Sequence, residues 1–363
     1  MKDKFVPKYM LIYNDLKSAI QSDALLPGTQ LPFERELCDK YSVQRITVRK
    51  ALDMLVQDGY INKRAGLGSF VCKRETEPEQ SGTLLFVMCK SQNDIKSNSS
   101  AFNAQLFFIM EQLCRNAGFT LVYAGISDEK ELQSLINQYS PSGAFSVSTL
   151  ENAMLNLLIN ASIPALCINH YDARLVSILP DNYDGIRQAV MHLAELGHER
   201  IAYIGGMQNS VNAQERQQSF SASLNEFMLP RHSEFIVNGD WTSETSFTLV
   251  RKMLSNLPDN KRPTALVAAS DMMAIGSIQA AVSLGIKVPD RFSVVGFDNI
   301  ELGKLCVPQI TSVGPSAKQM ADVSVNHMFD MINRRPSASD KYIVRLPNSF
   351  EIRGSSAKVQ KDI

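Results

Sequence analysis

Eight short apolar runs, separated by segments with helical periodicity, constrain the fold of this chain more than any other feature. They occupy residues 83–89, 119–125, 143–148, 164–169, 200–206, 235–241, 264–270 and 293–298. Near-continuous apolar strands are buried on both faces, and helices between them supply the crossovers of a parallel sheet. The pattern predicts an α/β body of two doubly wound, parallel-sheet lobes. In such folds a ligand binds at the carboxyl ends of the strands, here between the lobes.

Residues 1–72 follow a different pattern, in which helical segments precede a short hairpin. Apolar residues recur every three or four positions over 9–20, which predicts an amphipathic helix. A second short helix is expected at 33–41, and a third begins at Arg45 with basic side chains on its outer face. Residues 60–71, the wing, predict two strands around a glycine-containing turn. This order is typical of a winged helix-turn-helix domain.

The charge is distributed unevenly along the chain. In total, 37 basic and 37 acidic residues give a formal net charge of +0. Residues 1–74 hold 13 of the basic and only 8 of the acidic residues, so a basic head precedes an acidic body. A basic helix face alone would indicate only a solvated surface. Together with the order of helices and hairpin, it favours binding to the phosphate backbone of DNA.

The segment between head and body predicts a linker. Residues 73–82 are polar and charged, and they contain Pro78 and Gly82. We therefore expect a DNA-binding domain at 1–72, a linker at 73–82, and an effector-binding and dimerisation domain at 83–363.

Several other classes of protein are disfavoured. The six cysteines form no C-x-x-C pair, which argues against a zinc site and a disulfide framework. No apolar leader begins the chain, and no run approaches the roughly 18 apolar residues of a membrane span. No G-x-G-x-x-G, G-x-x-x-x-G-K-S/T or G-x-S-x-G motif occurs, and the five histidines have no metal-ligand spacing. We expect a cytoplasmic protein with no membrane partner, no catalytic residues, no metal and no cofactor.

Four segments of the head carry a family resemblance. They are P-G-T-Q-L-P-F-E-R-E-L at 27–37, V-Q-R-I-T-V-R-K-A-L at 43–52, D-G-Y-I at 58–61 and G-L-G-S-F-V at 66–71. Together they resemble the winged-helix domain of the GntR (gluconate repressor) family. The resemblance implies DNA contacts from four side chains: Arg35, Arg45, Thr47 and Arg49. Phe33 and Gln44 stand where that family often has serine, and Gln44 is a further candidate contact because glutamine can pair with adenine.

The wing adds four more candidates: Lys63, Arg64, Gly66 and Gly68. The glycines allow positive φ and a close approach of the backbone to a phosphate, and the two basic side chains add charge beside them. Glu34 is interpreted as a helix cap or as an orienting partner for Arg35, because no second carboxylate is placed to make it a catalytic acid.

Residues 83–355 carry a second resemblance. The segments are D-N-Y-D-G at 181–185, H-L-A-E-L-G-H-E-R-I-A-Y-I-G-G at 192–206, E-R at 215–216, G-D-W at 239–241, P-T-A at 263–265, D-M-M-A-I-G at 271–276 and V-P-D-R-F-S-V-V-G-F-D-N-I at 288–300. They look like the effector domain of the lac and galactose repressor family, which is similar to periplasmic sugar-binding proteins. Joined to a GntR-like head, the body resembles that of arabinose-repressor-type regulators.

This second resemblance implies an effector site of six side chains: Phe102, Asn169, Arg216, Trp241, Ser270 and Asp298. Arg216 and Asp298 would hold ligand hydroxyls with charge-assisted hydrogen bonds, and Trp241 would cover the apolar face of a sugar ring. Phe102 and Asn169 align more loosely, and Ser270 stands where the family usually has asparagine. Other interpretations stay open: a core tryptophan for Trp241, a surface ion pair for Arg216, and a helix N-cap for Asp298.

The sequence therefore predicts a homodimeric transcriptional repressor of carbohydrate-utilisation genes. It would bind a near-palindromic double-stranded operator and leave it when a small sugar, with a pentose or deoxyhexose favoured, closes the lobes. The linker lacks the hinge helix of lac-type repressors, so lobe closure must itself reorient the two heads. An activator of the same architecture is the main alternative. A sugar-binding transport component, an aminotransferase-like regulator, which would need a Schiff-base lysine, and an enzyme of sugar metabolism are others.

Overall fold

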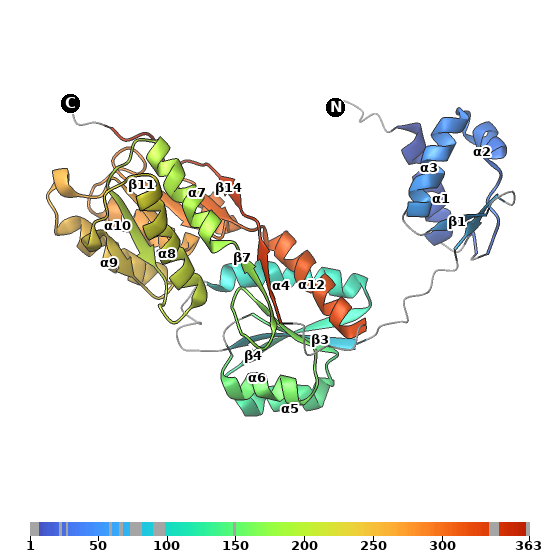
Figure 1. Cartoon of the computed structure of the whole chain (residues 1–363), viewed down its shortest axis with the longest axis horizontal. Helices are drawn as coiled ribbons and strands as arrows, with labels where there is room; N and C mark the ends of the chain where they lie inside the picture. The colour runs from blue at the N-terminus through green and yellow to red at the C-terminus, as the bar shows by residue number, and fades with distance from the viewer. Residues whose placement is uncertain are drawn as a thin grey trace. The chain divides into compact units, whose positions relative to one another are not determined.

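The chain forms two compact units, Met1–Gln80 and Ser81–Ile363, in the computed structural model (Figure 1). The structure describes residues 7–21, 24–26, 28–57, 60–64, 68–72, 82–89, 99–147, 150–333 and 341–360. The expected linker at 73–82 lies outside these residues except for Gly82. The division into 1–72, 73–82 and 83–363 therefore stays a prediction.

The first unit combines helices with a small hairpin. Its elements are α1 (Lys8–Gln21), α2 (Glu34–Tyr41), α3 (Arg45–Gln57), β1 (Ile61–Arg64) and β2 (Gly68–Val71). The two strands pair antiparallel, and Gln30 forms an antiparallel bridge to Phe70. Ser42 ends α2 in a left-handed conformation with φ of 51°, which turns the chain sharply into α3. The predicted winged helix-turn-helix domain is confirmed.

One apolar cluster holds this unit together. Its buried members include Ile12, Leu16, Leu37, Val48, Ala51, Leu52, Leu55, Ile61 and Val71, which come from all of these elements except the bridge. The expectation that Val56 also faces inward is wrong, because it is 39 % exposed at the edge of the buried face of α3. The cluster leaves the opposite face of α3 to the basic side chains.

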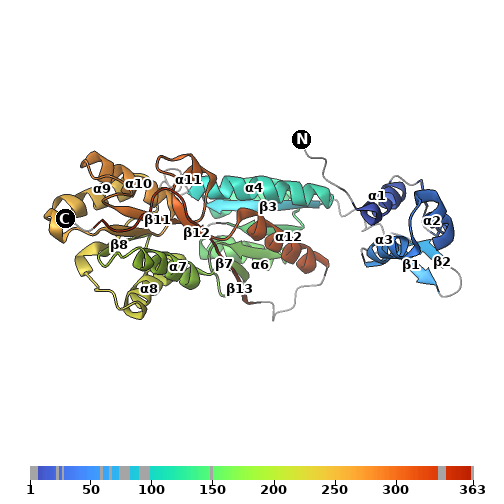
Figure 2. The same ribbon diagram turned by 90° about the horizontal axis from the view of Figure 1, so that it is seen from above.

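The second unit consists of two lobes, which we call the N-lobe and the C-lobe (Figure 2). The N-lobe contains β3 (Gly82–Cys89), α4 (Ser99–Asn116), β4 (Phe119–Ile126), α5 (Glu129–Tyr139), β5 (Gly143–Ser146), α6 (Asn152–Asn160), β6 (Ala165–Ile168), β7 (Val176–Pro180), α12 (Ala317–Asn333) and β13 (Ile343–Leu346). Its strands are parallel, in the order β13-β7-β6-β5-β3-β4. Helices α4 and α12 pack on one face of the sheet, and α5 and α6 pack on the other.

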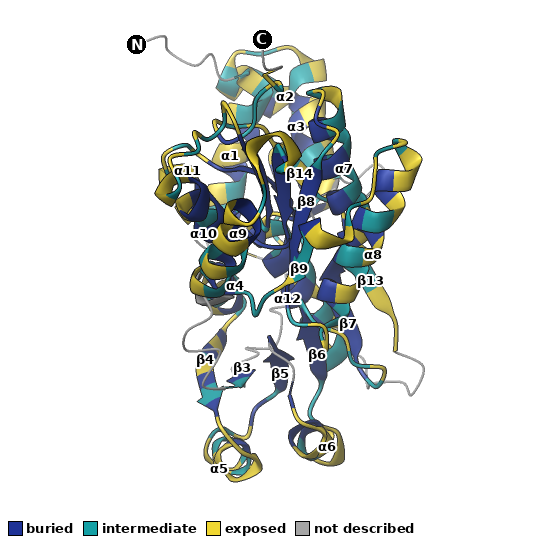
Figure 3. Ribbon diagram, turned by 90° about the vertical axis from the view of Figure 1, so that its left-hand side faces the viewer, coloured by how far each residue is buried: buried dark blue, intermediate teal, exposed yellow. Residues whose placement is uncertain are grey.

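The C-lobe repeats this layered arrangement. It contains α7 (Asn182–Glu195), β8 (Ile201–Gly205), α8 (Val211–Glu226), β9 (Ile236–Asn238), α9 (Ser243–Ser255), β10 (Ala265–Ala268), α10 (Asp271–Ser283), β11 (Ser293–Phe297), α11 (Glu301–Leu305), β12 (Thr311–Gly314) and β14 (Ser349–Glu351), with 3-10 turns at Ser233–Phe235 and Asp259–Lys261. The strand order is β14-β12-β11-β10-β8-β9, and only the β12–β14 pair among these is antiparallel. Figure 3 shows the strands of both lobes as buried layers between more exposed helices. The predicted α/β fold is confirmed.

The chain crosses between the lobes after β7, between β12 and α12, and between β13 and β14. The first crossing is shaped by Asp181, whose carboxylate accepts the backbone N–H of Asp184 at 3.0 Å and so caps α7. The apolar runs had not predicted β7, β12, β13 or β14. Polar or exposed residues interrupt these strands, and they are strands only because neighbouring strands pair with them.

No helix in the described ranges is both long and apolar enough to cross a bilayer.

Candidate functional site

The outer face of α3 carries the DNA-contact candidates of the recognition helix. The side chains of Arg45 and Arg49 are 69 % and 57 % exposed, Gln44 is exposed, and Thr47 is half-buried beside them. Arg35 is exposed on α2. These residues border a groove of about 810 Å³ between α2, α3 and the wing, so the structure brings the arginines to one surface.

Glu34 lies inside this groove and contacts the arginines of α3. Its carboxylate accepts the Nε–H of Arg45 at 2.5 Å and that of Arg49 at 3.1 Å. The expected partner Arg35 is therefore replaced by two arginines of the neighbouring helix. The capping role belongs to Glu36, whose carboxylate accepts the backbone N–H of Phe33 at 2.7 Å.

The wing candidates have different roles. The Lys63 ammonium lies 2.5 Å from Oδ1 of Asp53 and ties β1 to α3. Gly68 has φ of 102°, a conformation that favours glycine, and a Cβ there would lie 3.1 Å from the Gln30 amide. Gly66 and the side chain of Arg64 lie outside the described residues.

Four of the six effector-site candidates directly follow strands of the two lobes. Asn169 follows β6 in the N-lobe, and Trp241, Ser270 and Asp298 follow β9, β10 and β11 in the C-lobe. Because parallel strands end at one edge of their sheet, these residues lie on the edge of each lobe where ligands of such folds bind.

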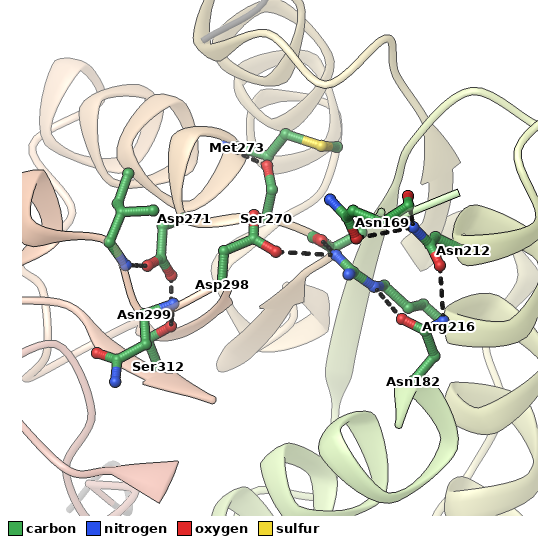
Figure 4. Close-up of polar contacts among 12 residues, drawn as sticks. Asn169, Asn182, Asn212, Arg216, Ser270, Asp271, Met273, Asp298, Asn299 and Ser312 are labelled. Carbon is green, nitrogen blue, oxygen red and sulfur yellow. Dashed lines mark hydrogen bonds and ion pairs between the residues drawn. The ribbon is translucent and has the colours of Figure 1, made fainter. Parts of the chain in front are cut away.

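Arg216 is the most buried of the candidates, with 2 % of the residue exposed. Its Nε–H donates to the Asn182 side-chain oxygen at 2.8 Å, and its Nη1 donates to the carbonyl of Ala269 and lies 3.4 Å from Oδ1 of Asp298 (Figure 4). The guanidinium carbon is 3.6 Å from the centre of the Phe297 ring. These contacts exclude a surface ion pair.

Asp298 is the acidic partner of this pair. Burial raises the pKa of its carboxyl to about 6, although Arg216 acts in the opposite direction. Its side chain keeps 25 % of its surface exposed. The residue is not the N-cap of α11, because that helix begins at Glu301 with Ile300 as its cap. Above pH 6 the site therefore holds an ionised carboxylate next to a guanidinium.

Asparagine side chains connect this pair to the N-lobe. Asn182 donates to the Asn212 oxygen at 2.9 Å, and Asn212 donates to the Asn169 backbone carbonyl at 2.7 Å and to its side-chain oxygen at 3.1 Å (Figure 4). Asn169 has φ of 60°, which asparagine tolerates better than most residues. The chain of hydrogen bonds therefore runs from Asp298 and Arg216 in the C-lobe to Asn169 in the N-lobe. Sequence reasoning had singled out neither Asn182 nor Asn212 as a site residue.

An ion pair also joins the lobes near this network. Arg345 of β13 donates through both terminal nitrogens to the carboxylate of Glu215 on α8, at 2.8 and 2.6 Å. Burial alone would raise the pKa of Glu215, but hydrogen bonds from Arg345 and Asn182 lower it. Glu215 precedes Arg216 in the E-R motif, so the motif supplied a signal, whereas nothing in the sequence indicated Arg345.

The two aromatic candidates lie against apolar clusters. Trp241 is half-buried against the C-lobe core, 5.8 Å from the Arg216 guanidinium carbon to the ring centre, and has φ of 71°. Gly206 makes room for it, because a Cβ at that position would overlap the indole. Phe102 is 8 % exposed and belongs to the N-lobe cluster that also contains Met272 of α10.

Ser270 and Asp271 have structural partners. The Ser270 hydroxyl accepts the backbone N–H of Met273 at 3.2 Å and caps α10. Asp271 is fully buried; its Oδ1 is 2.6 Å from the hydroxyl of Ser312, and its Oδ2 accepts the backbone N–H of Ile300 at 2.8 Å. Burial and the nearby Asp298 raise the pKa of Asp271 to about 8, so its carboxyl is protonated at neutral pH.

The described residues contain no group of three or more His, Cys, Asp or Glu side chains that could hold a metal ion.

Two family descriptions match this chain in separate parts. "Bacterial regulatory proteins, gntR family" matches residues 8–71, and "Periplasmic binding protein-like domain" matches residues 190–356. The protein therefore joins a GntR-family helix-turn-helix domain to a periplasmic-binding-protein-like domain.

Known proteins of this kind resemble the chain over most of its length. The arabinose metabolism transcriptional repressor of Geobacillus stearothermophilus is 24 % identical over 92 % of this chain and 94 % of its own. The probable HTH-type transcriptional repressor ExuR of Bacillus subtilis (strain 168) is 26 % identical over 62 % of this chain and 68 % of its own. Among solved structures, a LacI family transcriptional regulator from Enterococcus faecium with bound ribose has a TM-score of 0.66 at 19 % identity, covering 77 % of this chain and all of the other. At that identity the likeness shows the fold alone.

Proposed function

We propose that this protein is a sequence-specific transcriptional repressor of carbohydrate-utilisation genes that a small sugar releases from its operator. The observation that carries the proposal is the union, in one chain, of a GntR-family head with a periplasmic-binding-protein-like body. The names of the arabinose repressor and of ExuR, which match both parts of this chain, support the same assignment.

The proposed operator site is the groove lined by Arg35, Arg45 and Arg49. Arginine can read guanine through two hydrogen bonds in the major groove, and exposed cations bind phosphates. Gln44, Thr47, Lys63, Arg64, Gly66 and Gly68 are proposed as further contacts. Two heads in a homodimer would read the half-sites of a near-palindromic operator.

The proposed effector site is centred on Arg216 and Asp298, with Trp241, Phe102, Asn169 and Ser270 around them. The Arg216–Asp298 pair offers a donor and an acceptor to adjacent sugar hydroxyls, and the half-buried indole suits the apolar C–H face of a sugar ring. A pentose or a deoxyhexose is the favoured effector. Binding of a sugar to both lobes would favour their closed arrangement and so alter the heads.

The proposal includes a cytoplasmic location, where the chromosome is accessible, and no enzymatic activity. An activator of the same architecture remains the second candidate, because the sign of regulation depends on the position of the operator. The DNA-binding head argues against a sugar transport component.

The test measures retardation of the DNA upstream of the protein's own gene, with and without a panel of pentoses, hexoses, deoxysugars and sugar phosphates. Retardation that one sugar relieves would support the proposal, and absence of retardation at low salt under all these conditions would refute it. Arg45→Ala and Arg49→Ala should abolish retardation and leave sugar binding intact, which Trp241 fluorescence reports because it is the single tryptophan.

The matching effector variants are Arg216→Ala and the nearly isosteric Asp298→Asn. Each should retain DNA retardation but respond to sugar only at higher concentration, since a hydrogen bond to a charged group contributes roughly 1.5–3 kcal/mol, or about ten- to a hundredfold in affinity. A variant that responds at the wild-type sugar concentration would remove its residue from the effector site.

A further inference from the structure

One carboxylate lies at the centre of the basic groove of the head. Glu34, the first residue of α2, is in contact with Arg45 and Arg49 of α3 at 2.5 and 3.1 Å. Its own side chain is 23 % exposed, whereas the two arginine side chains are 69 % and 57 % exposed. The hydrogen bond from Arg45 lowers the pKa of Glu34, burial opposes this effect, and Arg49 adds to it, so the group is ionised at neutral pH.

Both arginines use the same atom for this contact. Arg45 and Arg49 are four residues apart, so they are neighbours on one face of α3, and each donates its Nε–H to Glu34. The Nε–H is the inner donor of the guanidinium group. The contact therefore leaves the terminal Nη groups, which form the bidentate pair for guanine O6 and N7, on the exposed side of the helix.

A negative charge at this position has opposite effects on matching and unrelated DNA. An arginine side chain loses rotational freedom when it contacts a base, and a partner that already holds it reduces this cost for the matching sequence. Unrelated DNA is bound through its phosphates, which the carboxylate repels. Both effects increase the preference for one sequence over others.

We propose that Glu34 is a positioning residue for operator recognition, which holds Arg45 and Arg49 with their Nη groups directed at bases and weakens binding to unrelated DNA. This inference rests on the proposed function, because it assumes that the groove binds DNA. It assigns to Glu34 a role in specificity that its position at the start of a helix alone would not.

The experiment compares full-length wild-type protein with Glu34→Gln, Glu34→Asp and Asp39→Asn by fluorescence anisotropy. Asp39→Asn is the matched control, since it removes one negative charge from an exposed position of the same helix. The probes are the duplex that the wild type selects from a pool of random-sequence duplexes, and a scrambled duplex of the same composition. Aspartate keeps the charge but is one methylene shorter, so it cannot hold both arginines in the same geometry.

The quantity to compare is the ratio of affinities for the selected and the scrambled duplex. We expect this ratio to fall about tenfold or more in both Glu34 variants and to stay at the wild-type value in Asp39→Asn. Selection repeated with Glu34→Gln should relax the preference at guanine positions. Circular dichroism at the assay temperature verifies that each variant is folded.

Other results would overturn the inference. If Glu34 acts only through its charge, Glu34→Gln will bind both duplexes more tightly with an unchanged ratio, and Glu34→Asp will behave as the wild type. If it only supports α2, both affinities will fall together and the ratio will again be unchanged. A wild type that selects no sequence at all would instead refute the proposed function, and this inference with it.

Discussion

Replacing Asp271 by asparagine should remove a pH-dependent part of the stability of the C-lobe. Asp271 has no exposed surface, and burial together with Asp298 raises the pKa of its carboxyl from an ordinary 3.8 to about 8. Its two oxygens contact the Ser312 hydroxyl and the Ile300 N–H. An amide can keep both contacts, because the serine hydroxyl accepts as well as donates a hydrogen bond.

The sign follows from the direction of this shift. Since the pKa is higher in the folded protein, folding takes up a proton at any pH between the unfolded and the folded value. The resulting stabilisation is fully present below the unfolded value and is lost as the pH rises through about 8. One proton corresponds to about 1.4 kcal/mol per pH unit, so Asp271 should lose about 2 kcal/mol of stabilisation between pH 6 and pH 8.

Buried histidines act in the opposite direction over the same range. Burial lowers the pKa of His170 to about 4 and also lowers that of His192 and His198. Their neutral forms favour the folded protein above the ordinary value of 6.5, and this contribution is lost as the pH falls. The wild-type profile alone therefore mixes opposing contributions, and only the difference from the Asp271 variant isolates the carboxyl.

The assay is urea unfolding of wild type and Asp271→Asn at pH 6, 7 and 8, followed by the fluorescence of Trp241 in the C-lobe. The free energy of unfolding of the wild type, taken relative to the variant, should fall by about 2 kcal/mol across this range. Glu199→Gln, an exposed change in the same lobe, should instead give a profile parallel to the wild type. Parallel profiles for wild type and Asp271→Asn would mean that the carboxyl is ionised in the folded protein, and the reasoning would be wrong.

Two further predictions concern the contacts around the effector site. Glu215→Gln and Arg345→Gln, singly and combined, should give a coupling of about 1 kcal/mol in a double-mutant cycle of unfolding, because the ion pair is bidentate and only partly exposed. A coupling of zero would show that the pair does not hold the lobes together. Gly206→Ala should cost about 1–3 kcal/mol and shift the Trp241 emission, because the new methyl group would overlap the indole. Gly303→Ala is the control, since its nearest atoms lie 3.6 Å away; an equal loss there would exclude the proposed overlap.

The sequence alone predicted both folds and most of the strands. Helical periodicity, apolar runs and turn residues act over a few neighbouring positions, so they remain visible without tertiary contacts. The strands that escaped prediction show the limit. Strand β12 is fully buried although it reads T-S-V-G, because its polar side chains find partners such as Asp271. Strands β13 and β14 lie at sheet edges and keep exposed residues, so they contain no apolar run.

The candidate residues were also found in the sequence, but their partners were not. Arg45, Arg49, Arg216 and Asp298 carry charges in segments that resemble known families, and such segments are readable one at a time. Asn182 was quoted within such a segment but assigned no role, because a side chain's role here depends on hydrogen bonds between α7, α8 and the N-lobe.

What the sequence by itself determined is therefore the two domain types and the charged residues placed on them, because these depend on local pattern. Only the tertiary structure decided which charges pair: Glu34 with Arg45 and Arg49, and Glu215 with Arg345. It also decided the protonation of Asp271. Ion pairing and pKa depend on distances of a few ångströms and on exclusion of water, and the packing of elements far apart in the chain sets both.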